Sequence, residues 1–184
     1  MRPIFSIHAG EYLVGTHIEE NYKNLNVWIP AKDTGIDLLV TDKTNRKTLS
    51  IQVKFSKDFL GSRGNSVSSA VAAKVKSGGW WTFNQSKIES SAADLWILVL
   101  YRFTQKDYDF IIIEPQELLS RYHQLGRGPE KLQSYVWVTS SNRCWETRGL
   151  NKQQQEAIAN DGYSEPVRDL TRYLNNWTSV EQKL

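Results

Sequence analysis

Four polar residues near the start of the chain have side chains suited to metal-dependent hydrolysis. Asp37, Gln52 and Lys54 fall on two successive segments with the alternation of strands, and Glu11 falls on an earlier helical segment. Carboxylate oxygens are the ligands that hard divalent cations such as Mg²⁺ prefer. A lysine ammonium can hold a water and stabilise the negative charge that develops on a phosphate group. Brought together, these residues would suit the hydrolysis of a phosphodiester bond.

A β-hairpin would bring three of these residues to one face of a sheet. Segments 35–42 and 47–56 have strand character, and a polar turn at 43–46 separates them. A four-residue turn pairs residues whose numbers add to 89, so Asp37 lies opposite Gln52. Side chains alternate along a strand, so one face carries Asp37, Leu39, Thr41, Gln52, Lys54 and Ser56. The other face is wholly apolar and carries Ile36, Leu38, Val40, Ile51, Val53 and Phe55.

The fourth residue belongs to a helix predicted over residues 7–22, with Ser6 as its N-cap. Apolar residues recur at steps of four, four and three and form a stripe: Val14, Ile18, Tyr22 and Leu25. Glu11 lies at the N-terminal end of this stripe, whereas Glu19 and Glu20 lie off it. We therefore expect Glu11 to face the hairpin.

The rest of the chain predicts a sheet flanked by helices, in one domain over residues 1–184. Further strands are expected at 26–30, 94–103 and 108–114, of which 94–103 has the apolar run of a strand covered on both faces. Further helices are expected at 67–76, before Gly78 and Gly79, at 85–93, and at 115–125 with Pro115 in its first position. A C-terminal extension over about 130–184 adds a hairpin of 134–139 and 143–147 and two helices, 152–160 and 166–177. This order predicts an α/β or α+β fold around a mixed sheet.

The hairpin sequence resembles a known family of nucleases. Gly35-Ile-Asp37-Leu-Leu-Val, followed by Ile51-Gln52-Val-Lys54-Phe-Ser56, is similar to the PD-(D/E)xK nuclease superfamily, and its Gln-x-Lys form resembles the Mrr-like restriction endonuclease branch. The resemblance covers roughly residues 6–120 and implies a restriction-endonuclease-like α-β-β-β-α-β core, within about 6–125. The chain differs from the family pattern at Ile36, which stands in place of proline, and at Gln52, which stands in place of an acid.

The resemblance also implies roles for these residues and a Mg²⁺ or Mn²⁺ cofactor. Asp37 would bind the cation, and Glu11 would add a second carboxylate, directly or through a water. The backbone carbonyl of Val53 would supply a further ligand. Gln52 would offer its amide oxygen to the metal or orient a water. Lys54 would hold the attacking water and stabilise the developing phosphate charge.

The charge distribution favours a polyanionic partner. The whole chain carries a formal net charge of +3, but segment 43–76 has eight basic residues and one acid, so it alone carries +7. Such a basic field suits double-stranded DNA, although a solvated surface that happens to be basic explains the charge equally well. Four of these cations flank the predicted site and are expected to contact DNA phosphates: Lys57, Arg63, Lys74 and Lys76.

Several functions fit this pattern. The leading interpretation is a metal-dependent DNA endonuclease of restriction or another defence type, expected to act as a homodimer because two sites must reach two strands. A Holliday-junction resolvase is a second interpretation, and a catalytically inactive DNA-binding module of the same fold is a third. An interaction protein that uses its tryptophan-rich surface is a weaker fourth.

Other features narrow the class of protein. A single cysteine, Cys144, excludes an internal disulfide framework and a cysteine-based zinc site, and it is expected to be a buried apolar residue. The longest apolar runs are too short to span a bilayer, and the first residues do not resemble a secretion signal, so a cytoplasmic protein is expected. Trp80 and Trp81 are expected in a loop, where core or interface packing is favoured over base stacking.

Overall fold

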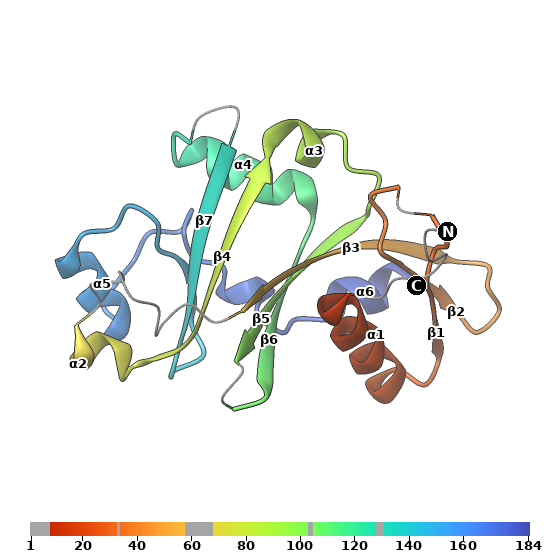
Figure 1. Cartoon of the computed structure of the whole chain (residues 1–184), viewed down its shortest axis with the longest axis horizontal. Coiled ribbons are helices and arrows are strands. Elements are labelled where there is room, and N and C mark those ends of the chain that lie inside the picture. Colours follow the sequence, from red (N-terminus) through yellow and green to blue (C-terminus); the bar gives the residue numbers. More distant parts are fainter. Residues whose placement is uncertain (1–7, 33, 58–67, 103–104, 128–130) are drawn as a thin grey trace, which may run out of the picture.

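The computed structural model describes residues 8–32, 34–57, 68–102, 105–127 and 131–184. Its helices and strands are arranged around two sheets (Figure 1). The elements are α1 (Ala9–Asn21), β1 (Leu25–Trp28), β2 (Leu38–Asp42), β3 (Thr48–Lys57), α2 (Ser69–Ala72), β4 (Val75–Asn84), α3 (Gln85–Glu89), β5 (Leu95–Arg102), β6 (Asp107–Ile113), α4 (Pro115–Gln124), β7 (Lys131–Thr139), β8 (Cys144–Glu146), α5 (Lys152–Ala159), the 3₁₀ helix η1 (Thr171–Tyr173) and α6 (Thr178–Lys183).

The larger sheet is mixed, as the sequence predicts. Its five strands follow the order β1-β2-β3-β5-β6, in which β3 and β5 are parallel and the other neighbours are antiparallel. β5 lies in the interior with nearly all of its residues buried, which confirms the prediction of a strand covered on both faces. A smaller antiparallel sheet has the order β4-β7-β8; its β7–β8 hairpin was predicted, but its third strand, β4, was not.

The hairpin of β2 and β3 has the register that the turn length predicts. Leu38 pairs with Ile51 and Thr41 with Thr48, so partner numbers add to 89 throughout. The apolar face is buried at Leu38, Val40, Leu49, Ile51 and Val53. Phe55 departs from this prediction, because 37% of its surface is exposed where β3 extends beyond β2.

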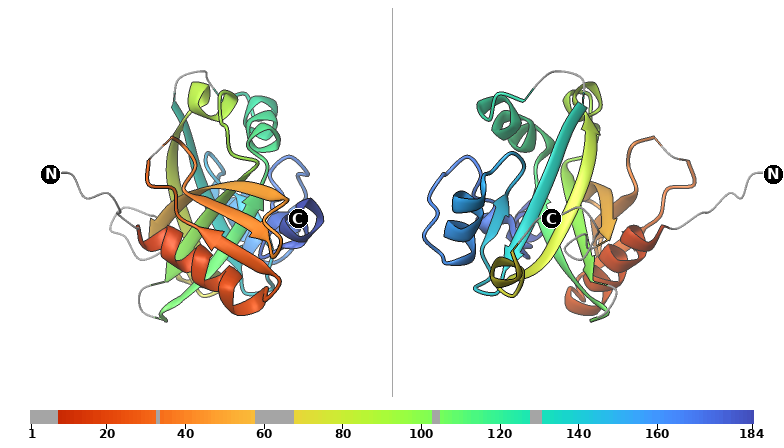
Figure 2. Two further views of the ribbon diagram at one scale, coloured as in Figure 1. Left: turned by 90° about the vertical axis from the view of Figure 1, so that its right-hand side faces the viewer. Right: turned by 60° about the vertical axis from the view of Figure 1, so that its left-hand side comes forward.

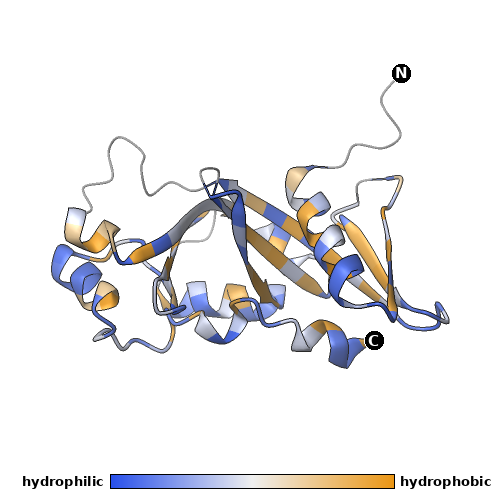
Figure 3. Ribbon diagram, turned by 90° about the horizontal axis from the view of Figure 1, so that it is seen from below, coloured by the Kyte–Doolittle hydropathy of each residue, from blue (hydrophilic) through white to orange (hydrophobic). Residues whose placement is uncertain are grey.

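The larger sheet is covered on both faces. α1 and α6 pack on one face through Val14, Ile18 and Val180. The smaller sheet packs on the other face, where Trp81 and Leu132 meet β5 and β6. Figure 2 shows β4 and β7 crossing β5 and β6, and in Figure 3 the apolar segments gather on the central strands. The mixed α/β fold is thus layered around one sheet.

The segment around the glycine pair forms a strand, and the predicted helix 67–76 is wrong beyond Ala72. β4 begins at Val75 and includes Gly78, Gly79 and both tryptophans, which were expected in a loop. Trp81 and Phe83 are buried while Trp80 and Thr82 are exposed, so burial alternates with the period of a strand. Gly79 is required by close packing, because a Cβ there would lie 2.4 Å from Trp81 Cη2.

The predicted helix 166–177 is also wrong. Its backbone instead bonds to neighbouring strands: Leu170 N–H donates to Cys144 C=O at 2.8 Å and Asn175 N–H donates to Phe110 C=O at 2.7 Å. Within residues 166–177, the only helical segment is the 3₁₀ helix η1. Leu170 and Trp177 are buried in the chain's own core, and Val167 and Leu174 are half-buried.

The remaining predicted elements are confirmed within a few residues. Pro115 occupies the first turn of α4, and the second hairpin forms as β7 and β8. Cys144 is fully buried, and burial raises the pKa of its thiol well above the usual value. In the described part of the chain, no helix has both the length and the apolar character to cross a bilayer.

Candidate functional site

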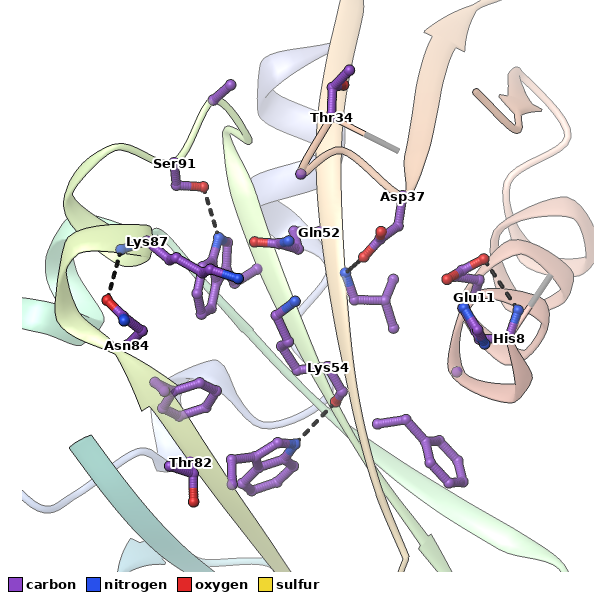
Figure 4. Close-up of a pocket in the computed structure, with 18 of the residues that line it drawn as sticks. His8, Glu11, Thr34, Asp37, Gln52, Lys54, Thr82, Asn84, Lys87 and Ser91 are labelled. Atoms are coloured by element: carbon purple, nitrogen blue, oxygen red, sulfur yellow. Dashed lines mark hydrogen bonds between the residues drawn. The ribbon is translucent and has the colours of Figure 1, made fainter. Parts of the chain in front are cut away.

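The four predicted catalytic residues line one cavity of about 920 Å³. It lies between β3, the N-terminal end of α1 and the junction of β4 with α3 (Figure 4). Glu11, Asp37, Gln52 and Lys54 all contribute to its wall. The sequence pattern therefore identified four residues that span 43 positions, from Glu11 to Lys54, and that the fold brings to one cavity.

Asp37 is fixed by the backbone of β3. Its N–H donates to Ile51 C=O at 2.9 Å, and its Oδ2 accepts a hydrogen bond from Val53 N–H at 2.7 Å. The preceding Gly35 has φ +83°, which favours glycine and lets the chain turn into β2. Because the N–H and C=O of one strand residue point to the same side, the Val53 carbonyl also faces Asp37. Among the described residues, no hydrogen-bond donor contacts the other carboxylate oxygen, which could therefore bind a ligand.

Glu11 reaches the same cavity from the first turn of α1. The helix begins at Ala9 with His8 as N-cap, and the predicted N-cap Ser6 lies outside the described residues. Glu11 Oε2 accepts a hydrogen bond from His8 N–H at 3.2 Å, and only 8% of the residue is exposed. Gly10 allows this close approach, since a Cβ there would lie 3.0 Å from both Val53 and Phe55.

Gln52 and Lys54 share one face of β3 and are half-buried. Lys54 Nζ lies 5.4 Å from the centre of the Trp96 ring, whose face attracts a cation. The carbonyl of Lys54 accepts a hydrogen bond from Trp81 Nε1 at 3.2 Å, so β4 fixes this part of β3. In Figure 4, Gln52 and Lys54 lie on the other side of β3 from Asp37 and Glu11. The predicted single polar face is therefore a cavity with an acidic side and a basic side.

Lys87 is a residue of the site that sequence reasoning missed. It belongs to α3, which Asn84 caps, and its side chain points across the cavity towards Gln52 and Lys54 (Figure 4). The only sequence signal was a lysine on a short predicted helix, and nothing in the pattern indicated its direction. Lys54 and Lys87 together place two cations opposite the carboxylates.

The donor set fits a hard divalent cation. Asp37, Glu11 and the Val53 carbonyl offer oxygen ligands, which Mg²⁺ and Mn²⁺ accept. Among the described residues, no three histidine, cysteine, aspartate or glutamate side chains gather at one point. A cation here would therefore keep several waters, as Mg²⁺ commonly does in proteins.

Of the four cations predicted to contact DNA phosphates, the three that the structure describes do not line the cavity. Lys57 is exposed at the end of β3, and Arg63 lies outside the described residues. Lys74 Nζ donates to Asn160 Oδ1 at 2.6 Å, and neither Lys74 nor Lys76 lines the cavity. Lys76 forms a salt bridge of 3.1 Å with the buried Asp109. Lys76 thus has a partner within the fold, and both Lys74 and Lys76 lie outside the cavity.

Asp109 of β6 is the centre of a charged network that also includes residues of β4 and β5. Arg102 pairs with it at 2.8 Å, and Asn175 donates a hydrogen bond to it at 3.0 Å. Burial alone would raise the pKa of its carboxyl, but the hydrogen bonds from Asn175 and Lys76 and the nearby positive charges hold this pKa below its usual value. Lys76 therefore stabilises the fold, which accounts for part of the basic segment.

Comparison with known proteins identifies no family. No protein-family model matches the chain, and comparisons with curated proteins and with solved structures give no significant match. The resemblance to PD-(D/E)xK nucleases therefore rests on the sequence pattern of the hairpin alone.

Proposed function

We propose that this chain is a metal-dependent endonuclease that hydrolyses phosphodiester bonds of double-stranded DNA, of restriction or another defence type. The observation that carries the proposal is that Glu11 of α1, Asp37 just before β2 and Lys54 of β3 line one cavity. Two carboxylates can hold a divalent cation that activates a water, and a lysine can stabilise the charge that develops on the phosphate. A solvated polar sheet face would not require an acid from α1 to be buried beside it.

Each side chain has a role that its position supports. Asp37, Glu11 and the Val53 carbonyl would hold Mg²⁺ or Mn²⁺, which when bound supplies positive charge and acidifies a bound water. Lys54 Nζ, held over Trp96, would hold the attacking water. Gln52 would orient that water or offer its amide oxygen to the cation.

The proposal extends to the fold. We propose that α1, the antiparallel strands β1 to β3 and the parallel strand β5 form a restriction-endonuclease-like core, with which their order along the chain is compatible. In this proposal α2 and α3, which lie between β3 and β5, would take the place of the crossover helix, and β4, which lines the cavity, would be an addition to the core. We propose that the remaining residues extend this core and that a homodimer cuts both strands.

A catalytically inactive DNA-binding module is the second candidate. Gln52 removes a carboxylate from the family pattern, and Asp37 already uses one oxygen on Val53 N–H. Both features lower the number of anionic oxygens available to a cation. The two candidates predict the same DNA binding and differ in cleavage.

Cleavage of supercoiled plasmid separates these candidates. The chain is incubated with plasmid in Mg²⁺, in Mn²⁺ and in EDTA, and DNA binding is measured under the same conditions. The endonuclease predicts nicked and linear products with metal and none in EDTA. Binding without cleavage in either metal would support the inactive module. Faster cutting of a four-way junction than of linear duplex would indicate a Holliday-junction resolvase.

A further inference from the structure

A second cavity, of about 560 Å³, is lined by basic residues and lies outside the proposed catalytic site. It is formed by the end of α4, the start of β7, the loop after β8 and the segment after α5. The described residues that line it are Leu125, Arg127, Lys131, Gln133, Arg148, Gly149 and Arg168. Among these described residues, four are cationic and none is acidic. This concentration of positive charge around one cavity has no function in the hydrolysis proposed above.

Two of the arginines are held in place by ion pairs with a buried carboxylate. The side chains of Arg127 and Arg168 are only 12% and 13% exposed, and both contact the carboxylate of Glu146, which is 2% exposed. Each also donates to the backbone carbonyl of Arg148, at 3.3 Å and 3.0 Å. These bonds hold both guanidinium groups in one orientation before any ligand arrives, which reduces the entropy that binding would cost.

The other two cations are available to a ligand. Lys131 and Arg148 are exposed, and neither side chain forms a hydrogen bond or ion pair with another residue in the described part of the chain. Among the described residues, four positive charges, less the negative charges of Glu146 and of Glu165, which binds Arg168 at 3.0 Å, leave a net charge of +2. A phosphate monoester carries about −1.5 to −2 at neutral pH, so it matches this excess.

The basic cavity is connected to the catalytic cavity across the smaller sheet. Lys131 pairs with Asn84 and Gln133 pairs with Thr82 in the β4–β7 register. Directly paired residues share a face of a sheet, and both Asn84 and Thr82 line the catalytic cavity. A polar strip of four side chains therefore runs from one cavity to the other.

We propose that the basic cavity binds a phosphate group that carries about two negative charges, as a phosphate monoester or inorganic phosphate does. Arginine guanidinium groups offer paired donors that match phosphate oxygens. The polar strip makes the terminal phosphate of a nucleic-acid strand one source of the group, and free inorganic phosphate is the other. The proposal does not rest on the endonuclease activity, because neither Lys131 nor Arg148 lines the catalytic cavity.

The test uses the double variant Lys131→Ala/Arg148→Ala and a matched control. The control Arg46→Ala/Lys47→Ala removes the same two charges from the exposed turn between β2 and β3. In the first arm, inorganic phosphate is titrated against each chain at constant ionic strength, and the thermal midpoint is recorded. In the second arm, oligonucleotides with a 5′-phosphate or a 5′-hydroxyl compete for each chain.

The parent and the control should be stabilised by inorganic phosphate in a saturable way, or should bind the 5′-phosphorylated strand at least about tenfold more tightly than the hydroxyl form. The double variant should lose this preference. An effect in the first arm alone indicates free phosphate, and an effect in the second alone indicates a strand terminus. Identical behaviour of the double variant and the control in both arms would overturn the proposal, as would equal binding of the two strands with no response to phosphate.

Discussion

Gln52 is the residue at which the chain departs most from the chemistry of a two-acid metal site. It lines the same cavity as Asp37, and its Nε2 lies 4.0 Å from the position that a Cβ on Gly35 would occupy. Gln52→Glu would add a carboxylate to the oxygen ligands. Affinity for Mn²⁺, measured by calorimetric titration, should therefore rise. Unchanged affinity would place Gln52 outside the metal's ligand shell.

Lys87 provides a prediction that follows from the structure and not from the sequence pattern. Lys87→Ala should weaken DNA binding and reduce the log–log salt slope by about one, because one phosphate contact is lost. Lys74→Ala is the matched control, since Lys74 binds Asn160 away from the cavity. Both are measured by salt titration of binding to duplex DNA. A larger loss in the control than in Lys87→Ala would contradict the assignment.

At the scale of elements, β4 closes the cavity and depends on a close contact at Gly79. Trp81 Cη2 and Leu100 Cγ would lie 2.4 Å and 3.1 Å from a Cβ at this position. Gly79→Ala should therefore lower the free energy of unfolding by about 1–3 kcal/mol. Gly15→Ala in α1 is the control with the opposite sign, since its nearest neighbour is 3.7 Å away and alanine stabilises a helix by roughly 0.5–1 kcal/mol. Urea denaturation measures both, and equal effects would contradict the packing argument.

The β2–β3 hairpin and β4 show where sequence reasoning succeeds and where it fails. The register of the β2–β3 hairpin was predicted to the residue because it follows from a local turn and an alternating pattern. β4 was not, because it pairs with β7, about 50 residues further along the chain, and such pairing leaves little local signal. The glycine pair looked like a helix end, whereas Gly79 makes room for Trp81.

The candidate site was predicted to a similar extent. Glu11, Asp37, Gln52 and Lys54 follow from periodicity and from the family resemblance, and the structure places them in one cavity. Lys87 and the buried partner of Lys76 depend on how distant elements pack, which local patterns do not encode. The 166–177 segment failed for the same reason: backbone bonds to β6 and β8 outweigh an apolar helical period.

At the scale of the whole molecule, Asp109 joins both sheets and the C-terminal segment. It contacts Lys76 of β4, Arg102 of β5 and Asn175. Asp109→Ala leaves the buried Arg102 with one carboxylate fewer and should cost about 3–5 kcal/mol of unfolding free energy at neutral pH. Denaturation of the variant and the parent checks this value. If Asp109→Ala lost less unfolding free energy than Asp161→Ala, which changes an exposed aspartate, the stabilising role of the network would be contradicted.

The same network predicts how stability depends on pH. The folded-state pKa of Asp109 is lower than the unfolded value, so its ionised form stabilises the fold above the unfolded pKa. This stabilisation is lost as the pH falls below about 4 and through the folded pKa. Denaturation at pH 7, 5 and 3 should therefore show a steeper acid loss for the parent than for Asp109→Ala. Parallel curves would show that other groups control acid unfolding.

The most direct test of the central claim is the single-turnover cleavage rate of Asp37→Asn in Mg²⁺, beside that of the parent. Asparagine keeps an oxygen that can accept the Val53 N–H bond, so the fold and DNA binding should remain. The negative charge that holds the cation is lost, and the rate should fall by at least about a hundredfold. Cleavage by Asp37→Asn at the parent's rate, with DNA binding unchanged, would show that another site performs the hydrolysis.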